Sequence, residues 1–194
     1  MAYPTVQAPY GLKPVNLIGG QVFAGSTREF PIQYGYATNI FYGDFVTIVR
    51  GLATRGAITT ATSSATSGVF LGCSYTNPTT KQKMFSQYWQ AGTLAGDAVA
   101  ILTDDPDTVF RTAVVTAQGG STIGSANIAL IGQNVDASNL AGNVNTGNSS
   151  NGVVQKAATP ALTAAPLRVI DVVDETSVSV SATGSSSKIG RAHV

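Results

Sequence analysis

The chain has 194 residues, of which 43% are hydrophobic and only 11% are Asp, Glu, Lys or Arg, and its formal net charge is +1. This length fits one domain, or a domain with an appended arm. The low share of charged residues implies a surface built mainly from Ser, Thr, Asn, Gln and Gly. No stretch concentrates Lys or Arg and no apolar run is long enough to cross a bilayer, so we expect neither nucleic acid nor a membrane as a partner.

The first 19 residues are punctuated by prolines at positions 4, 9 and 14. Because proline has no backbone N–H, this segment can be neither a helix interior nor a central strand. It also lacks the basic and apolar regions of an export signal. We therefore predict an extended N-terminal arm over residues 1–19, followed by one domain over residues 20–187.

From residue 20 onward, short runs rich in Val, Ile, Phe, Tyr and Thr alternate with clusters of Gly, Asn, Asp and Pro. This pattern is typical of an all-β sandwich or barrel. We therefore predict a mainly β fold, a single antiparallel β-barrel or jelly-roll-like sandwich domain. The predicted strands cover residues 21–24, 29–33, 45–50, 69–75, 84–89, 98–103, 109–115, 153–156, 167–173 and 177–181.

Some segments allow a finer prediction. The run FVTIVR, residues 45–50, has apolar residues on both faces and is expected to be a central strand, whereas SVSVS, residues 177–181, is expected to be half-buried or at an edge. Residues 125–131 fit at most about two turns of helix. Residues 57–67 and 137–152 are predicted to be long loops, suited to inter-subunit contact or to solvent display.

The last residues, IGRAHV at positions 189–194, resemble the translation of a widely used sequencing adapter. We interpret residues 188–194 as an adapter-derived artefact and set them aside. This removes His193, the only histidine in the chain. It also means that the domain over residues 20–187 is expected to be truncated at its C-terminus.

The residues that could carry chemistry are few. Without a native histidine there is no Ser/His/Asp or Cys/His arrangement, and Cys73, the single cysteine, lies in the apolar run VFLGCSY and is expected to be structural. The run Asp104, Asp105, Pro106, Asp107 lacks the ligand spacing of a calcium loop and is expected to form a tight turn. We therefore predict no enzyme activity, no catalytic residues, no metal and no cofactor.

Three stretches resemble a family of small virion proteins from tailed phages, especially phages of marine bacteria. They are APYGLKPVNLIGG, then GVFLGCSYTNPTTKQKMFSQYWQAGT with the following DDPDTVF, and PLRVIDVVDE, and the resemblance covers most of residues 8–175. Members are described as capsid decoration proteins, also called cement or head-stabilising proteins. The resemblance implies a β-barrel or jelly-roll-like subunit that sits on the capsid surface and bridges shell proteins, with an extended N-terminal arm.

The same resemblance implies the partners and the contact residues. The partners would be the major capsid protein and neighbouring copies of the chain, as a homo-oligomer (dimer or trimer) on the virion after synthesis in the bacterial cytoplasm. Tyr3, Tyr10, Leu12 and Val15 of the arm are the expected interface residues. Such contacts, repeated on every capsomer, would resist rupture of the shell.

Two alternatives remain open at the level of sequence. The chain could be another virion component, such as a head fibre base or a tail protein, which would share the same composition. It could also be a carbohydrate- or surface-binding β module in which Tyr75, Tyr88 and Trp89 form a stacking platform. The adjacent positions of Tyr88 and Trp89 place them on opposite faces of a strand, which weakens a shared platform.

Overall fold

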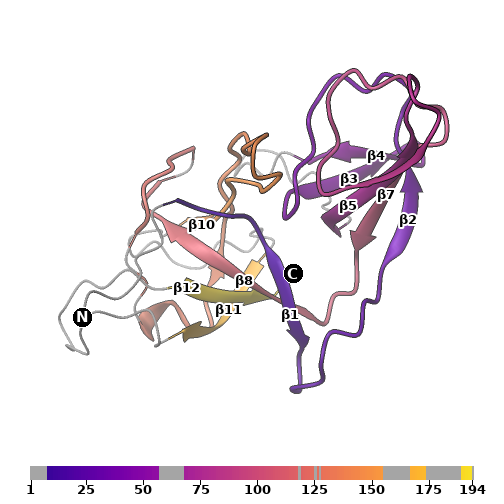
Figure 1. The fold of residues 1–194 in the computed structure, drawn as a ribbon. Coiled ribbons are helices and arrows are strands. Elements are labelled where there is room, and N and C mark those ends of the chain that lie inside the picture. The colour runs from indigo at the N-terminus through magenta and orange to yellow at the C-terminus, as the bar shows by residue number, and fades with distance from the viewer. Residues whose placement is uncertain are drawn as a thin grey trace, which may run out of the picture.

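The structure is a computed structural model that describes residues 8–56, 68–117, 119–124, 126, 128–154 and 167–173, and the backbone of residues 189–193. The protein is mainly β, as predicted, and its strands form two sheets. Figure 1 shows one sheet, called sheet I here, at the lower left and the other, called sheet II, at the upper right. Among the residues described, none belongs to a helix with the length and hydropathy of a membrane span.

Sheet I is formed by the two ends of the chain. Its strand order is β1 (Lys13–Leu17), β8 (Thr108–Val115), β12 (Ile189–His193), β11 (Leu167–Val173) and β9 (Asn134–Val135), and β10 (Val153–Val154) pairs with β8. All pairings within this sheet are antiparallel except that of β10 with β8. A single 3-10 turn, η1 (Ile128–Leu130), lies in the segment where one or two helical turns were expected.

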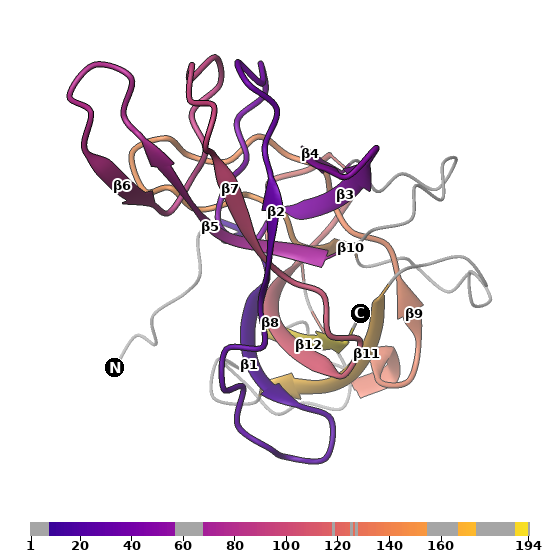
Figure 2. The same cartoon turned by 90° about the vertical axis from the view of Figure 1, so that its right-hand side faces the viewer.

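Sheet II is formed by the middle of the chain. Its order is β2 (Arg28–Pro31), β7 (Val99–Thr103), β5 (Gly68–Thr76), β3 (Phe45–Val49) and β4 (Leu52–Arg55), and β6 (Lys83–Ser86) pairs with β5. The chain thus passes from sheet I to sheet II after β1 and returns with β8 (Figures 1 and 2). The two sheets do not close into one barrel, so the sandwich-like form of the prediction is the one that holds.

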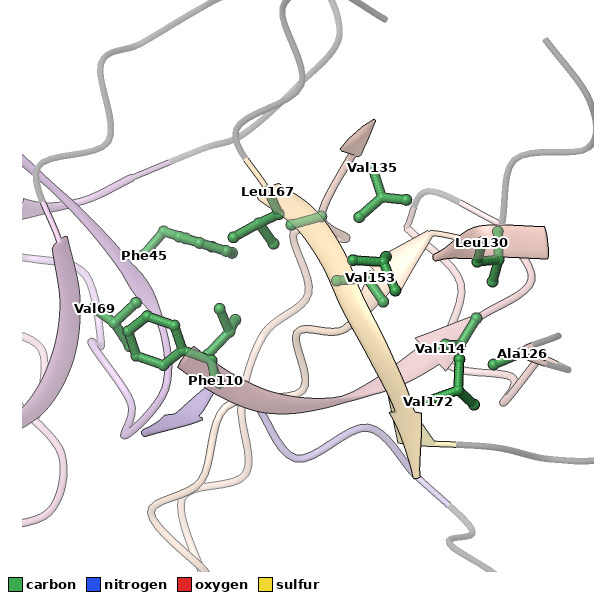
Figure 3. Close-up of a cluster of buried hydrophobic side chains, with 13 residues drawn as sticks. Phe45, Val69, Phe110, Val114, Ala126, Leu130, Val135, Val153, Leu167 and Val172 are labelled. Carbon is green, nitrogen blue, oxygen red and sulfur yellow. The ribbon is translucent and has the colours of Figure 1, made fainter. Parts of the chain in front are cut away.

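The first hydrophobic core lies against sheet I and extends to sheet II. Phe110 and Val114 of β8 point into it, together with Leu167 of β11, and Phe45 and Val69 reach it from sheet II (Figure 3). These side chains are almost completely buried. The two sheets are therefore joined by apolar packing as well as by chain connections.

The second core lies on the other face of sheet II. It contains Val46 of β3 and Phe70 of β5, and Ile40 and Trp89 cover them from the segments that flank the sheet. Because Phe45 enters one core and Val46 the other, β3 is apolar on both faces and lies between β4 and β5. The prediction of a central strand over FVTIVR is confirmed.

The arm prediction differs from the structure over the residues described. Residues 13–17 form β1, which pairs with β8, and Leu12 has 0% of its surface exposed and belongs to the first core. Pro14 is tolerated because β1 is an edge strand with a shift of register between Pro14 and Asn16. The segment from residue 8 onward is therefore part of the domain, while residues 1–7 lie outside the described residues.

Smaller differences concern single strands. Residues 21–24 make only an isolated bridge, between Asn16 and Val22, and Val22 is exposed, so the predicted strand is wrong. The short strands β4 and β9 were not predicted. The loop predicted over residues 137–152 contains no strand, as expected, whereas residues 57–67 and 177–181 lie outside the described part of the chain.

The backbone of residues 189–193 forms β12 between β8 and β11 and pairs with both. Strand pairing uses backbone N–H and C=O groups that every residue other than proline carries. The pairing is therefore compatible with the interpretation of residues 188–194 as adapter-derived.

Candidate functional site

A buried carboxylate fixes the turn that leads into β3. Asp44 has no exposed surface, and its carboxylate accepts hydrogen bonds from Phe41 N at 2.9 Å, Arg55 Nε at 3.0 Å, Ser149 Oγ at 2.5 Å and Asn151 Nδ2 at 3.0 Å. A buried charge is tolerated when it is paired and hydrogen-bonded in this way. This cluster is therefore a structural hub.

The hub also orders the long loop over residues 137–152. Ser149 and Asn151 come from this loop, and the guanidinium of Arg55 donates to the carbonyl of Leu140 within it. Burial raises the pKa of the Asp44 carboxyl, while the positive charge of Arg55 and the hydrogen bond from Ser149 act in the opposite direction. The loop that was predicted to serve for contact or display is therefore held to the domain by hydrogen bonds from Ser149 and Asn151 to Asp44.

A groove lies where β1 of sheet I meets β5, β6 and β7 of sheet II. Its volume is about 550 Å³, and it is lined by Lys13, Tyr42, Leu71, Gly72, Cys73, Phe85, Ser86, Gln87 and Ile101. Phe85 on β6 is 79% exposed, while Leu71 and Ile101 are half-buried. The lining combines apolar side chains with one cation and contains no carboxylate.

The cation of the groove, Lys13, lies near two aromatic rings. Lys13 Nζ lies 5.2 Å from the ring centroid of Tyr10 and 5.8 Å from that of Tyr42, which is cation–π geometry. Burial raises the pKa of the Tyr10 hydroxyl, and the positive charge of Arg111 beside it acts in the opposite direction. Tyr10, Lys13, Tyr42 and Arg111 thus form one cluster, called here the cationic cluster.

Lys13 and Arg111 are direct cross-strand partners in the β1–β8 pair. Partners in an antiparallel pair share a face of the sheet, with Cβ atoms about 4.5–5.5 Å apart. Neither residue takes part in the ion pairs found among the described residues, which join Arg28 to Asp104, Arg55 to Asp44 and Lys83 to Asp97. The cationic cluster therefore carries positive charge that no described carboxylate neutralises.

A second hollow, called here the apolar cup, lies on sheet I. Its volume is about 540 Å³, and it is lined by Asn16, Leu17, Ile18, Gly19, Gly20, Val109, Ile131, Gly132, Arg168, Val169, Ile170 and Asp171. Ile18, Ile131 and Ile170 are exposed. The apolar cup shares no residue with the groove.

The four expected interface residues have different environments. Tyr10 is half-buried in the cationic cluster, Val15 on β1 is 39% exposed, and Tyr3 lies outside the described residues. Leu12 is a core residue without exposed surface, so in this structure it packs within its own chain and cannot contact a neighbouring subunit. Lys13 and Arg111 were not singled out from the sequence, because only the strand register brings them together.

The aromatic platform considered for a carbohydrate-binding module is not exposed. Trp89 has 0% of its surface exposed and donates from Nε1 to the carbonyl of Tyr36 at 3.3 Å, and Tyr75 packs edge-on against it at 5.6 Å. Tyr88 stacks on Phe41 at 5.5 Å instead. In this structure Trp89 cannot stack on a sugar ring.

The residues with chemical potential are in structural environments. Cys73 is buried, and burial raises the pKa of its thiol to about 12. In the run predicted to form a turn, the Asp105 carboxylate accepts the N–H of Asp107 at 2.9 Å and Asp104 pairs with Arg28, which confirms the turn. Over the described residues, no group of three or more His, Cys, Asp or Glu side chains is placed to hold a metal ion.

The groove with its cationic cluster and the apolar cup are the candidate functional surfaces, since both present side chains that the fold itself leaves uncovered. The chemistry they offer is that of contact: apolar area, aromatic rings, the cations Lys13, Arg111 and Arg168, and the carboxylate of Asp171. Comparison of the chain with protein-family models, with curated proteins and with solved structures gives no match.

Proposed function

We propose that this protein is a non-catalytic structural subunit of a tailed-phage virion that decorates the capsid and stabilises it by bridging major capsid proteins. The observation that carries the proposal is the presence of two separate hollows with exposed apolar side chains on one β domain. A subunit that bridges neighbours needs two contact surfaces, and exposed apolar patches mark such surfaces. The resemblance of three sequence stretches to phage decoration proteins supports the same function.

The two hollows share no lining residue, although β1 contributes Lys13 to the groove and Asn16 and Leu17 to the apolar cup. Figure 2 shows β6, which supplies one wall of the groove, at the upper end, and the loop that follows β1, which supplies one wall of the apolar cup, at the lower end. One copy could thus contact two shell subunits at once. The effect is multiplied by repetition, because many weak contacts on one particle act together.

The interior of the domain supports a mechanical role. The Asp44 hub ties together the turn before β3, β4 and the loop over residues 137–152, and the two cores pack on both faces of sheet II. A bridging subunit transmits force only when its two contact surfaces are held at a fixed separation. Close-packed cores of this kind are poorly compressible.

The experiment uses particles that package this gene. Particles are banded in a density gradient, fractions are tested for nuclease-protected DNA that carries the gene, and the tryptic peptide over residues 84–111 is quantified by mass spectrometry. We expect this peptide to follow the major capsid protein across the gradient at a constant molar ratio. Particles that contain the gene and the capsid protein but lack the peptide would refute the proposal.

The ratio in the same experiment separates the proposed function from its nearest alternative. A decoration subunit is expected in a number comparable to that of the major capsid protein. A head fibre base or a tail protein would be present in far fewer copies per particle. A low, fixed ratio would therefore keep the protein in the virion but reject capsid decoration.

A further inference from the structure

We propose that the groove binds an extended segment of a partner protein in which acidic residues are interspersed with apolar ones. Lys13 and Arg111 would contact the acidic side chains, and Phe85 the apolar ones. This inference deepens the proposed function and rests on it in one respect, because it takes the segment to belong to a shell protein. The chemistry of the segment follows from the groove itself.

The strongest evidence is the placement of two cations directly across from one another. Lys13 and Arg111 are partners in the β1–β8 register, and like charges at such positions destabilise an antiparallel pair. The tyrosine rings offset part of this cost through cation–π contact, but they bring no negative charge. A carboxylate placed between the two cations would neutralise the repulsion.

The groove gives the incoming segment a second kind of contact. Phe85 extends into solvent from β6, beside the half-buried Leu71 and Ile101. A single exposed apolar residue needs no explanation, but Phe85 lines a hollow together with two further apolar side chains, Leu71 and Ile101. An apolar side chain of the partner could fill this hollow while a neighbouring acidic residue faces Lys13.

The shape of the site favours an extended segment. The pairing of β6 is with β5, and the other described strands leave the second edge of β6 unpaired over residues 83–86. An extended peptide can hydrogen-bond to an open strand edge and place alternate side chains in adjacent pockets. The alternation of acidic and apolar residues in the partner follows from this geometry.

Nucleic acid fits the site less well. A phosphate backbone is held by a stripe of many cations, and each neutralised phosphate requires one. The groove and its cluster offer two cations, and most of the other lining residues are apolar or uncharged. A protein segment can contact both the two cations and the apolar residues around Phe85, whereas a phosphate chain would contact only the cations.

The test is a selection from a library of random peptides on the immobilised full-length protein, with counter-selection on the Lys13→Glu/Arg111→Glu double variant. We expect the enriched peptides to share Asp or Glu alternating with apolar residues. The affinity of one enriched peptide, labelled with a fluorophore, is then measured by anisotropy against single variants. We expect Lys13→Glu, Arg111→Glu and Phe85→Ser each to weaken binding by about tenfold or more.

A matched control is Arg50→Glu, which reverses the charge of an exposed cation that lines neither the groove nor the apolar cup. This variant should leave the affinity for the peptide within about twofold, because mutations at sites that share no partners act independently. Circular dichroism and the urea midpoint of each variant establish that it is folded. Enriched peptides without acidic residues, or binding that survives both charge reversals in folded variants, would overturn the proposal.

Binding of a nucleic acid, measured with poly(dT), tests the alternative ligand of the groove. Binding of poly(dT) that depends on Lys13 and Arg111, without any acidic peptide consensus, would assign the cluster to nucleic acid and reject the proposal. The selection uses no phage particle, so its failure is distinct from failure of the proposed function. An acidic consensus together with absence of the protein from particles would reject capsid decoration and keep the groove as a peptide site.

Discussion

Asp44 and Arg55 form an ion pair in which Arg55 Nε donates to the Asp44 carboxylate at 3.0 Å, with Asp44 fully buried and Arg55 partly exposed. The pair joins β4 to the turn before β3, and the same carboxylate accepts from Ser149 and Asn151 of the long loop. A single side chain thus holds three segments that are distant in sequence.

Replacement of Asp44 by alanine should therefore be strongly destabilising. It leaves Arg55 and two buried polar side chains without their acceptor, and removal of one partner from such a pair costs about 3–5 kcal/mol. We expect this loss in the free energy of unfolding, measured by urea denaturation. The control is Asp107→Ala at an exposed turn, and equal stability of the two variants would contradict the role of the hub.

Two phenylalanines test the assignment of core and surface. Phe110 is almost completely buried in the first core, whereas Phe85 is 79% exposed. Phe110→Ala should cost about 3–5 kcal/mol because it removes apolar contacts and leaves a cavity. Phe85→Ala should change the free energy of unfolding by no more than about 0.5 kcal/mol. Chemical denaturation gives the free energy of unfolding of both variants. Similar losses of stability in the two would contradict the exposed placement of Phe85.

Asp97 should contribute to the loss of folding stability at acidic pH. Hydrogen bonds from the side chain and backbone of Thr76 lower the pKa of Asp97 from 3.8 to about 2, with a further contribution from Lys83. Because the pKa is lower in the folded state, this contribution to stability is complete above pH 3.8 and is lost as the pH falls towards about 2.

The measurement is the free energy of unfolding as a function of pH across that interval. Asp97→Asn removes the titrating group, so the variant should lose less stability on acidification than the wild type. The conservative change Asp107→Asn at an exposed turn serves as the control. An unchanged slope in Asp97→Asn would show that the Thr76 hydrogen bonds do not form in solution.

The thiol of Cys73 should be inert in the folded protein. It is 1% exposed, it lies 3.5 Å from the carbonyl of Tyr88, and burial raises its pKa to about 12. Since the thiolate is the reactive form, a thiol reagent such as DTNB should label the native protein slowly and the urea-unfolded protein rapidly. Fast labelling under native conditions would contradict the buried environment.

The charge conflict across β1 and β8 has its own consequence for stability. Lys13→Glu converts a like-charge cross-strand pair into an opposite-charge pair with Arg111, which is worth about 0.2–1 kcal/mol. We expect a higher urea midpoint at low salt and a smaller gain at high salt. A lower midpoint would show that Lys13 stabilises the fold through its tyrosine contacts and that the two cations do not repel each other.

The fold class and most strands of the described chain could be predicted from local patterns. The bounds of β11 match the predicted segment, and those of β3, β7 and β8 differ from it by one residue at one end, because strands buried on a face show clear apolar runs. The strand β1 was not predicted, because proline argues against a strand and only an edge position with a shifted register accommodates it. Local sequence contains no signal for that position.

The candidate site was less predictable than the fold. Tyr10 was chosen for an arm, and its actual neighbours, Lys13 and Arg111, depend on a register between residues about 100 positions apart in sequence. Leu12 was chosen for the same arm and instead belongs to the core. Lone charged residues in strands carry no pattern, so their convergence is visible only in three dimensions.

The most direct test of capsid decoration is binding of the purified protein to empty shells assembled from the major capsid protein of a tailed phage that carries this gene. The protein is added at increasing concentration, and the shells are sedimented and analysed for bound protein. We expect saturation at a fixed number of copies per shell subunit and a higher temperature of shell rupture. Protein that stays in the supernatant at all concentrations, with no change in rupture temperature, would contradict it.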